Sequence, residues 1–261
     1  MDTLQLVLLS AIQGLTEFLP VSSSAHLVLL SEFLGQKDQG IIFDVGIHFG
    51  TLMAAIFYFR LDIKNMFDSL TAKKFSKREN SLTINLIVAV LPILIVGFLL
   101  RDFVDLKLRN SVVIAYATIF FGILLYFAQL QKRNKSLDSL SLNQAFLIGI
   151  SQCLALVPGT SRSGITITAA LFLGLNARDA SKFSFLLAIP TIGAIALAEL
   201  IRFTYIDLTQ NGIELFMASI ISFLVAYISI GIFFRLIDRI GFTPFVVYRI
   251  LLGCSLLIFW I

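Results

Sequence analysis

The stretch from Gln13 to His26 reads QGLTEFLPVSSSAH and places a glutamate, three consecutive serines and a histidine inside an apolar segment. The apolar segments on either side, 4–15 and 25–34, are each shorter than the about 20 residues that a helix needs to cross a bilayer. Pro20 and the serines therefore predict two half-helices joined by a polar break. Ionisable residues within a membrane segment are costly and usually functional, so we expect this break to carry a site.

The composition is that of an integral membrane protein. Of the 261 residues, 58% are hydrophobic and 14% are charged, with a mean hydropathy of +0.93, whereas soluble domains carry about 25% charged residues. The net charge of +4 suits contact with anionic lipid head groups, and no basic patch indicates nucleic acid. The start, Met1-Asp2, lacks a basic signal-peptide region, so we expect it to stay in the mature protein. Cys153 and Cys254 lie in apolar runs, and we expect buried, unpaired thiols.

A second polar break lies far downstream. The apolar segments 142–157 and 164–175 are again short, and the sequence PGTSRSG at 158–164 separates them. Six other segments are long and apolar enough to be spans: 41–59, 82–100, 112–130, 183–201, 213–234 and 242–261. One broken pair followed by three spans thus occurs twice. We predict an all-α integral membrane protein with six transmembrane helices and two re-entrant broken-helix hairpins. It forms a single domain of two inverted-topology repeats, about 1–130 and about 142–261.

Charge distribution predicts the orientation. One set of connections is rich in lysine and arginine: 60–81, 131–141, 176–182 and 235–241. The other set is poorer: 32–40, 101–111 and 202–212. The positive-inside rule places the first set in the cytoplasm. The first hairpin then enters from outside and the second from inside, an arrangement that brings a site to the membrane midplane.

The chemistry expected at the two breaks is anion binding. Both half-helices begin with serines, and helix N-termini combine free N–H groups with the positive end of the dipole. Arg162 adds a planar fork of donors that is always charged. These features predict a site for a diphosphate. Its predicted binding residues are Ser22, Ser24, Thr160, Ser161, Ser163 and Thr166.

Four residues are predicted to be catalytic: Glu17, Ser23, His26 and Arg162. His26 follows Ser22 and Ser23 by four and three residues, so the three share a helix face. The nucleophile is Ser23 activated by His26, His26 itself, or a water molecule. Glu17 orients the base, accepts a proton or holds a divalent cation, Mg²⁺ or Ca²⁺, together with diphosphate oxygens. Gln13, four residues earlier, is a weaker candidate ligand.

The other polar residues of the apolar segments are expected to be structural. His48 could join the site, but its counterpart in the second half is Ala188, so we expect His48 to be structural. Three residues near span ends are expected to be interfacial: Asp44, Glu199 and Arg249. Two amides are expected to hydrogen-bond between helices: Asn85 and Gln152.

The two breaks resemble the motifs of the undecaprenyl-diphosphate phosphatase family, also called the bacitracin-resistance protein family. Residues 13–26 fit the family's (Glu/Gln)-x-x-x-Glu element followed by a serine run and histidine, and residues 158–166, PGTSRSGIT, fit Pro-Gly-x-Ser-Arg-Ser-x-x-Thr. The resemblance covers essentially the whole chain. Gln13 stands where many members carry Glu, so Glu17 is the acid that we expect to be essential. Ala25 replaces a frequent Gly, which exchanges one small residue for another.

The resemblance implies a multi-pass enzyme of the bacterial inner membrane that removes the terminal phosphate of undecaprenyl diphosphate. The product, undecaprenyl phosphate, carries cell-wall precursors. The resemblance also implies a divalent-cation requirement, a site open to the outer face, and bacitracin resistance on overproduction. The alternative is a polyprenyl-phosphate flippase or anion transporter, because inverted repeats with broken helices are a transporter plan. A homodimer is one assembly that we consider, although the residues select no oligomeric state.

Overall fold

The structure is a computed structural model that describes residues 3–33, 40–71, 77–108, 110–132, 134–200 and 212–259. These residues form helices and no strand, with one isolated parallel bridge between Lys135 and Leu175. The predicted all-α class is therefore confirmed. By length and composition, four of the helices can cross a membrane, or five if a bent pair counts as one span.

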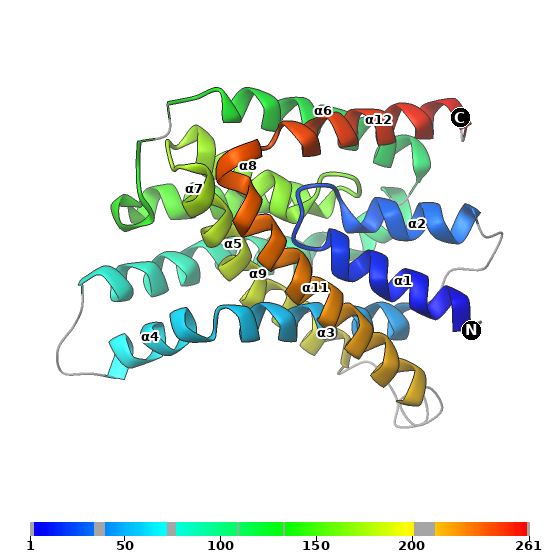
Figure 1. Cartoon of the computed structure of the whole chain (residues 1–261), viewed down its shortest axis with the longest axis horizontal. Coiled ribbons are helices and arrows are strands. Elements are labelled where there is room, and N and C mark those ends of the chain that lie inside the picture. The colour runs from blue at the N-terminus through cyan, green and yellow to red at the C-terminus, as the bar shows by residue number, and fades with distance from the viewer. Residues whose placement is uncertain are drawn as a thin grey trace.

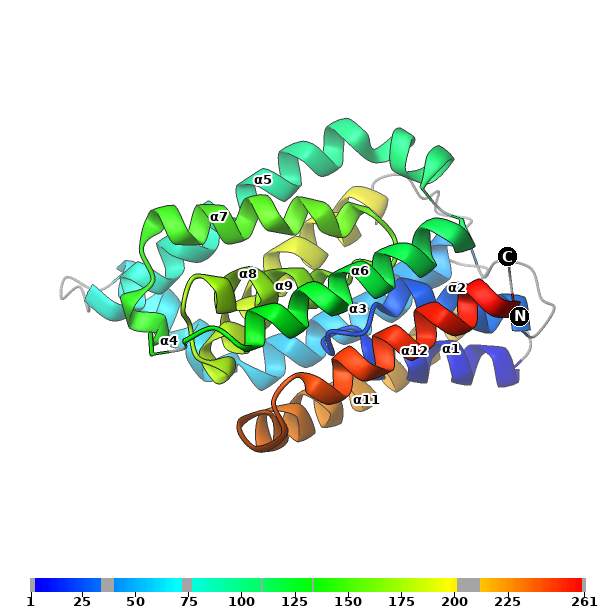
Figure 2. The ribbon, with the colours of Figure 1, turned by 90° about the horizontal axis from the view of Figure 1, so that it is seen from above.

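Two helical hairpins turn toward each other from opposite ends of the bundle (Figures 1 and 2). The first consists of α1 (Thr3–Thr16) and α2 (Ser23–Phe33). The second consists of α7 (Leu142–Gln152), the 3-10 turn η2 (Cys153–Leu156) and α8 (Arg162–Phe172). Each of the four α-helices has 11 to 14 residues, too few to cross a bilayer. The sequence thus predicted both breaks at the right places.

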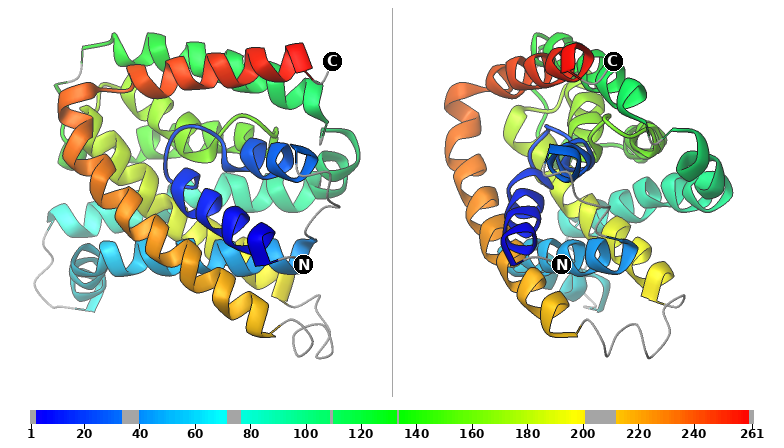
Figure 3. Two further views of the ribbon diagram at one scale, coloured as in Figure 1. Left: turned by 45° about the vertical axis from the view of Figure 1, so that its right-hand side comes forward. Right: turned by 90° about the vertical axis from the view of Figure 1, so that its right-hand side faces the viewer.

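The remaining long helices surround these hairpins. They are α3 (Ile41–Tyr58), α5 (Lys77–Lys107), α6 (Ser111–Gln129), α9 (Ala177–Leu200), α11 (Gly212–Ile240) and α12 (Thr243–Phe259). α6 and α12 lie side by side along one face, and α11 crosses the bundle obliquely (Figures 1 and 3). α11 packs against α1 and α3, whereas α5 packs against α7 and α9. Each hairpin is therefore covered by a long helix from the other half of the chain.

Several connections that the sequence predicted as loops are helical. In the predicted loop 60–81, α4 (Arg60–Thr71) follows α3 after a bend of 70°, and α5 already begins at Lys77. In the same way α5, α9 and α11 extend into the predicted connections 101–111, 176–182 and 235–241. Lysine, arginine and glutamate favour helix, so a helix continues after its apolar span ends. The predicted connections 32–40 and 202–212 lie almost wholly outside the described residues.

Small residues allow the helices to pack closely. A Cβ at Gly50 of α3 would overlap the backbone of Ser219 on α11, and one at Gly149 of α7 would overlap Ala89 on α5. Close backbone approach at such residues is typical of membrane helix pairs. Both cysteines are free, as expected. Cys153 is half-buried but Cys254 is exposed, so the predicted burial is wrong for Cys254, which lies on an outward face of α12.

Candidate active site

The first break wraps around a buried carboxylate. Gln13 and Glu17 are four residues apart and face the same way, and Gln13 Nε2 donates to Glu17 Oε2 at 2.8 Å. Ser23, the first residue of α2, donates its hydroxyl to the same Oε2 at 2.9 Å. Glu17 is only 8% exposed. The side chains that the sequence singled out in this break therefore contact one another.

The second break repeats the local structure of the first. Ser22 and Ser161 each precede a half-helix, and both adopt left-handed backbone conformations, with φ of 73° and 67°, which residues other than glycine rarely adopt. In both breaks the hydroxyl of this serine lies 3.2 Å from that of the serine two residues later, Ser24 or Ser163. Ser161 Oγ also accepts the N–H of Gly164 at 3.1 Å and so caps α8.

Arg162 joins the two breaks. Its Nη2 donates to Glu17 Oε1 at 2.6 Å, in an ion pair whose side chains are 14% and 6% exposed. Beside it, Ser163 Oγ donates to the carbonyl of Leu19 at 2.9 Å. Removing one partner of such a buried pair leaves an uncompensated charge, which is strongly destabilising. The two breaks therefore form a single polar site inside the bundle.

Three buried polar atoms at this site have no hydrogen-bond partner among the residues that the structure describes: Gln13 Oε1, Thr160 Oγ1 and Arg162 Nη1. Buried polar atoms in proteins are nearly always paired. A guanidinium N–H and a hydroxyl can both donate to a phosphate oxygen. Arg162 Nη1 and Thr160 Oγ1 thus provide donors that an anionic ligand needs, whereas Gln13 Oε1 can only accept.

His26 contacts neither Ser23 nor Arg162 through any hydrogen bond of the described residues. Its Nδ1 lies 2.7 Å from the carbonyl oxygen of Ser22, and its Nε2 lies 2.5 Å from the hydroxyl of Tyr248 on α12. Ser23 pairs with Glu17 instead. The predicted arrangement in which His26 activates Ser23 as the nucleophile is therefore not present in this structure.

The remaining predicted binding residues differ in their surroundings. Ser24 is exposed and contacts Ser22. Thr166 is buried, and its hydroxyl bonds the carbonyl of Arg162 at 2.9 Å and the hydroxyl of Ser184, on α9, at 2.7 Å. Thr166 thus fastens α8 to α9 and is saturated within the protein.

Arg249 is a central residue that the sequence analysis misplaced. It is 0% exposed and not interfacial. Its guanidinium donates to four backbone carbonyls, at 2.9 to 3.4 Å: those of Pro20, Thr118, Gly159 and Thr160. Gly159 and Thr160 lie in the second break and Pro20 lies in the first, so Arg249 ties both breaks to α6 and α12. An arginine seven residues into an apolar segment was the signal for a buried, functional position.

His48 also lies at the site, although it was predicted to be structural. Its Nε2 is 3.8 Å from Glu17 Oε2, while its Nδ1 lies 2.7 Å from the carbonyl oxygen of Asp44. The predicted amide contact between helices is confirmed for Gln152 of α7, which accepts from Thr191 of α9 at 3.3 Å. Asn85 of α5 instead donates to the carbonyl of Leu140, in the connection before α7, at 2.9 Å.

Comparison with known proteins gives the family. A sequence model of the family described as bacitracin resistance protein BacA matches residues 6–255. The chain belongs to this family. It is 45% identical over 261 residues to an undecaprenyl-diphosphatase from Hahella chejuensis, with 99% of this chain and 98% of that protein covered. It is 44% identical to undecaprenyl-diphosphatase 1 of Pseudoalteromonas translucida, with 99% of each covered, and 46% identical to an undecaprenyl-diphosphatase of Alcanivorax borkumensis, with 100% of each covered.

In this member of the bacitracin resistance family, the described residues contain no group of three or more His, Cys, Asp or Glu side chains that could hold a metal ion. A cation bound here would therefore need ligands from the substrate. Glu17 supplies a carboxylate, and the unpaired Oε1 of Gln13 supplies a second oxygen beside it. Hard divalent cations take such oxygen ligands and complete their shells with phosphates and water, so these two residues fit Mg²⁺ or Ca²⁺.

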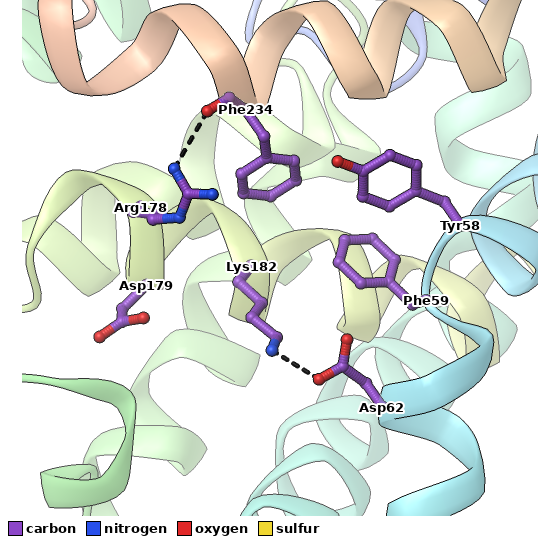
Figure 4. Close-up of a pocket in the computed structure, with 7 residues that line it drawn as sticks. All are labelled: Tyr58, Phe59, Asp62, Arg178, Asp179, Lys182 and Phe234. Atoms are coloured by element: carbon purple, nitrogen blue, oxygen red, sulfur yellow. Dashed lines mark hydrogen bonds and ion pairs between the residues drawn. The ribbon is translucent and has the colours of Figure 1, made fainter.

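A separate pocket of about 260 Å³ opens where α3 and α11 end and α9 begins (Figure 4). Its cations are already paired, Arg178 with Asp238 at 2.6 Å and Lys182 with Asp62 at 2.5 Å. The rings of Phe18, Phe185 and Phe234, with centroids 5.2 and 5.3 Å apart, form a continuous contact from the first break to this pocket. Packed aromatic residues therefore separate this pocket from the polar site.

Proposed function

We propose that this chain is an undecaprenyl-diphosphatase, which hydrolyses undecaprenyl diphosphate to undecaprenyl phosphate and inorganic phosphate. The observation that carries the proposal is the contact of Glu17 with both Ser23 and Arg162, where two half-helices begin. Relatives that are named for this activity match the full chain at 44–46% identity. The reaction regenerates the carrier lipid for cell-wall synthesis and confers resistance to bacitracin.

The diphosphate binds between the N-termini of α2 and α8. Both helix starts present the positive ends of their helix dipoles, which favour anions. Arg162 Nη1 and Thr160 Oγ1, which lack partners among the described residues, donate to phosphate oxygens. Four serine hydroxyls complete the lining: Ser22, Ser24, Ser161 and Ser163. Thr166 does not contact the diphosphate and instead positions Arg162 by donating a hydrogen bond to its backbone carbonyl.

In the first chemical step Ser23 Oγ attacks the terminal phosphorus, and its proton passes to Glu17 Oε2, 2.9 Å away. The bond between the terminal phosphorus and the bridging oxygen breaks, and that oxygen leaves with the bonding electrons on undecaprenyl phosphate. In the second step water attacks the phosphoserine. Glu17 returns its proton to the departing Ser23 oxygen, one water proton passes by way of His26 to bulk solvent, and the other stays on the released phosphate.

Positioning and charge neutralisation supply most of the catalysis in phosphoryl transfer. Arg162 and the two helix N-termini offset the charge that shifts between the attacking, transferred and leaving oxygens. A positioned base such as Glu17 typically contributes about 10²–10⁴-fold. Glu17 and Gln13, together with the diphosphate, would hold a divalent cation, Mg²⁺ or Ca²⁺, and the bound cation would neutralise further charge.

The membrane arrangement that we propose has six spans and two re-entrant hairpins in two inverted repeats, about 1–130 and about 142–261. Matching left-handed serines, matching serine pairs and the reciprocal covering of the hairpins by α5 and α11 support it. The protein resides in the bacterial inner membrane, and the site opens to the outer face, where undecaprenyl diphosphate is released.

The test is phosphate release from a polyprenyl diphosphate by the purified protein in detergent. We expect wild-type protein to release phosphate, and Ser23→Ala to lose activity by a factor of at least about 10². Stopping wild-type turnover with acid should leave phosphoserine at position 23, detected by mass spectrometry. Ser181→Ala is the control, because Ser181 lies on α9 and its hydroxyl bonds the carbonyl of Ala177. A pure carrier would release no phosphate, and that result would overturn the proposal.

A further inference from the structure

We propose that Tyr248 is a positioning residue that fixes the ring of His26 during the reaction. This inference deepens the proposed function and rests on it. Tyr248 lies on α12, 222 positions from His26 in the sequence, and its hydroxyl is 2.5 Å from His26 Nε2. The two rings are almost parallel, at 3°, with centroids 5.5 Å apart. The phenol hydroxyl is therefore within hydrogen-bonding distance of the imidazole nitrogen.

The partners of the ring determine which nitrogen carries the proton. A backbone carbonyl can only accept, so the 2.7 Å contact of Nδ1 with the Ser22 carbonyl requires Nδ1–H. In the neutral ring Nε2 is then an unprotonated acceptor, and the Tyr248 hydroxyl donates to it. Nε2 is consequently the nitrogen that exchanges a proton with the reaction, while Nδ1 stays bonded to Ser22.

A tyrosine hydroxyl suits this task because it can both donate and accept. When His26 is neutral, Tyr248 donates to Nε2. When His26 is protonated, Nε2–H donates to the same oxygen. The ring therefore keeps one orientation in both protonation states, held by Ser22 at one edge and by Tyr248 at the other. Fixed orientation of an acid–base group is what efficient proton transfer requires.

α12 is well placed to hold Tyr248 in register with the breaks. The next residue, Arg249, is wholly buried and bonds carbonyls of both breaks. Tyr248 itself is 43% exposed, so the pair lies at the rim of the site and not beside the buried Glu17. One turn of α12 thus anchors the breaks through Arg249 and orients His26 through Tyr248.

The experiment combines spectroscopy with kinetics on full-length protein in detergent. The chain has two histidines, so ¹⁵N-imidazole labelling gives two rings, and His48→Gln assigns them. In Tyr248→Phe we expect the Nε2 resonance of His26 to move while His48 is unchanged. We also expect kcat for phosphate release to fall at least about tenfold, the order expected for loss of one such hydrogen bond, with KM within about twofold. Tyr126→Phe is the control, since Tyr126 lies on α6 and is similarly exposed, at 41%.

An unchanged His26 spectrum, or an unchanged kcat, in Tyr248→Phe would overturn the inference. If Tyr248→Phe does not fold, Tyr248→Gln and Tyr248→Leu replace it. Glutamine can donate and accept, so its kcat should exceed that of the leucine variant, and equal values would also overturn the inference. A wild-type protein that releases no phosphate would overturn the proposed function instead, while the spectra would still report the bond between Tyr248 and His26.

Discussion

At the scale of single residues, Glu17 is the point where the two halves of the site meet. One carboxylate oxygen accepts from Arg162, and the other accepts from Gln13 and Ser23. Donors on both oxygens hold the carboxylate plane in one orientation. The serine hydroxyl is consequently aimed by the same group that takes its proton, and a small displacement of Arg162 would disturb both functions.

Arg162→Lys keeps the positive charge but removes the planar fork. A lysine ammonium cannot hold Glu17 with one edge and offer a second fixed N–H to the diphosphate. We expect kcat/KM for phosphate release to fall by about 10–100-fold, as for loss of one or two charge-assisted hydrogen bonds. Arg178→Lys in the pocket of Figure 4 is the control and should retain wild-type turnover. Equal kcat/KM for the two variants would remove Arg162 from the mechanism.

Gln13→Glu would place a second carboxylate beside Glu17. Because divalent cations bind more tightly as the number of anionic oxygen ligands rises, we expect half-maximal activity at a Mg²⁺ concentration several-fold lower than for wild type. With a chelator present, activity should be lost in both proteins. Gln131→Glu, at an exposed position, controls for the added charge. An unchanged Mg²⁺ dependence would argue against a cation between Gln13 and Glu17.

At the scale of helices, α12 links the breaks to the rest of the bundle. Arg249→Met removes donors from the carbonyls of Pro20, Thr118, Gly159 and Thr160. An unsatisfied buried polar group costs about 1–3 kcal/mol, so we expect a loss of at least about 3 kcal/mol in unfolding free energy. A lower midpoint temperature of thermal unfolding in detergent would report it. Arg235→Met, at an exposed position on α11, is the control and should unfold at the wild-type midpoint temperature. A wild-type midpoint temperature in Arg249→Met would show that these contacts do not stabilise the fold.

The helices show where sequence reasoning succeeds. The breaks were predictable because Pro20 and the Pro158-Gly159 pair interrupt apolar segments that are too short to span. α4 was not predictable, because each predicted span ended where the apolar residues end. Charged residues such as Arg60 and Lys64 form a further helix after that point. The buried position of Arg249 had a signal, because an arginine inside an apolar segment is costly and usually functional. Its partners had none, because they depend on which carbonyls other segments bring to α12.

The pairing inside the site was only partly predictable. Helical spacing predicted that Gln13 and Glu17 face the same way, and the planar, always charged guanidinium of Arg162 predicted anion binding at the second break. The bond from Ser23 to Glu17 depends on the path of the break between them, and the bond from Tyr248 to His26 joins residues of distant helices. Neither has a local signal in the sequence.

At the scale of the whole molecule, the proposed topology places position 103, on α5 beyond the apolar span, outside and position 134 inside. Both are exposed in the structure. After replacement of Cys153 and Cys254 by alanine, we expect Phe103→Cys to react with a membrane-impermeant maleimide on intact cells. Asn134→Cys should react only after permeabilisation. Labelling of both positions from the same side would contradict the inverted arrangement.

The reciprocal packing of α5 and α11 makes the two halves interdependent. If either half were synthesised alone, its hairpin would lack the long helix of the other half that covers it. The uncovered hairpin surface would then be exposed to lipid and to proteases that degrade misfolded membrane proteins. A nick near Lys132, where the chain is exposed between α6 and α7, would break no such contact. Two fragments expressed in the same cell should therefore associate through these contacts and restore enzyme activity, as two subunits of a complex do.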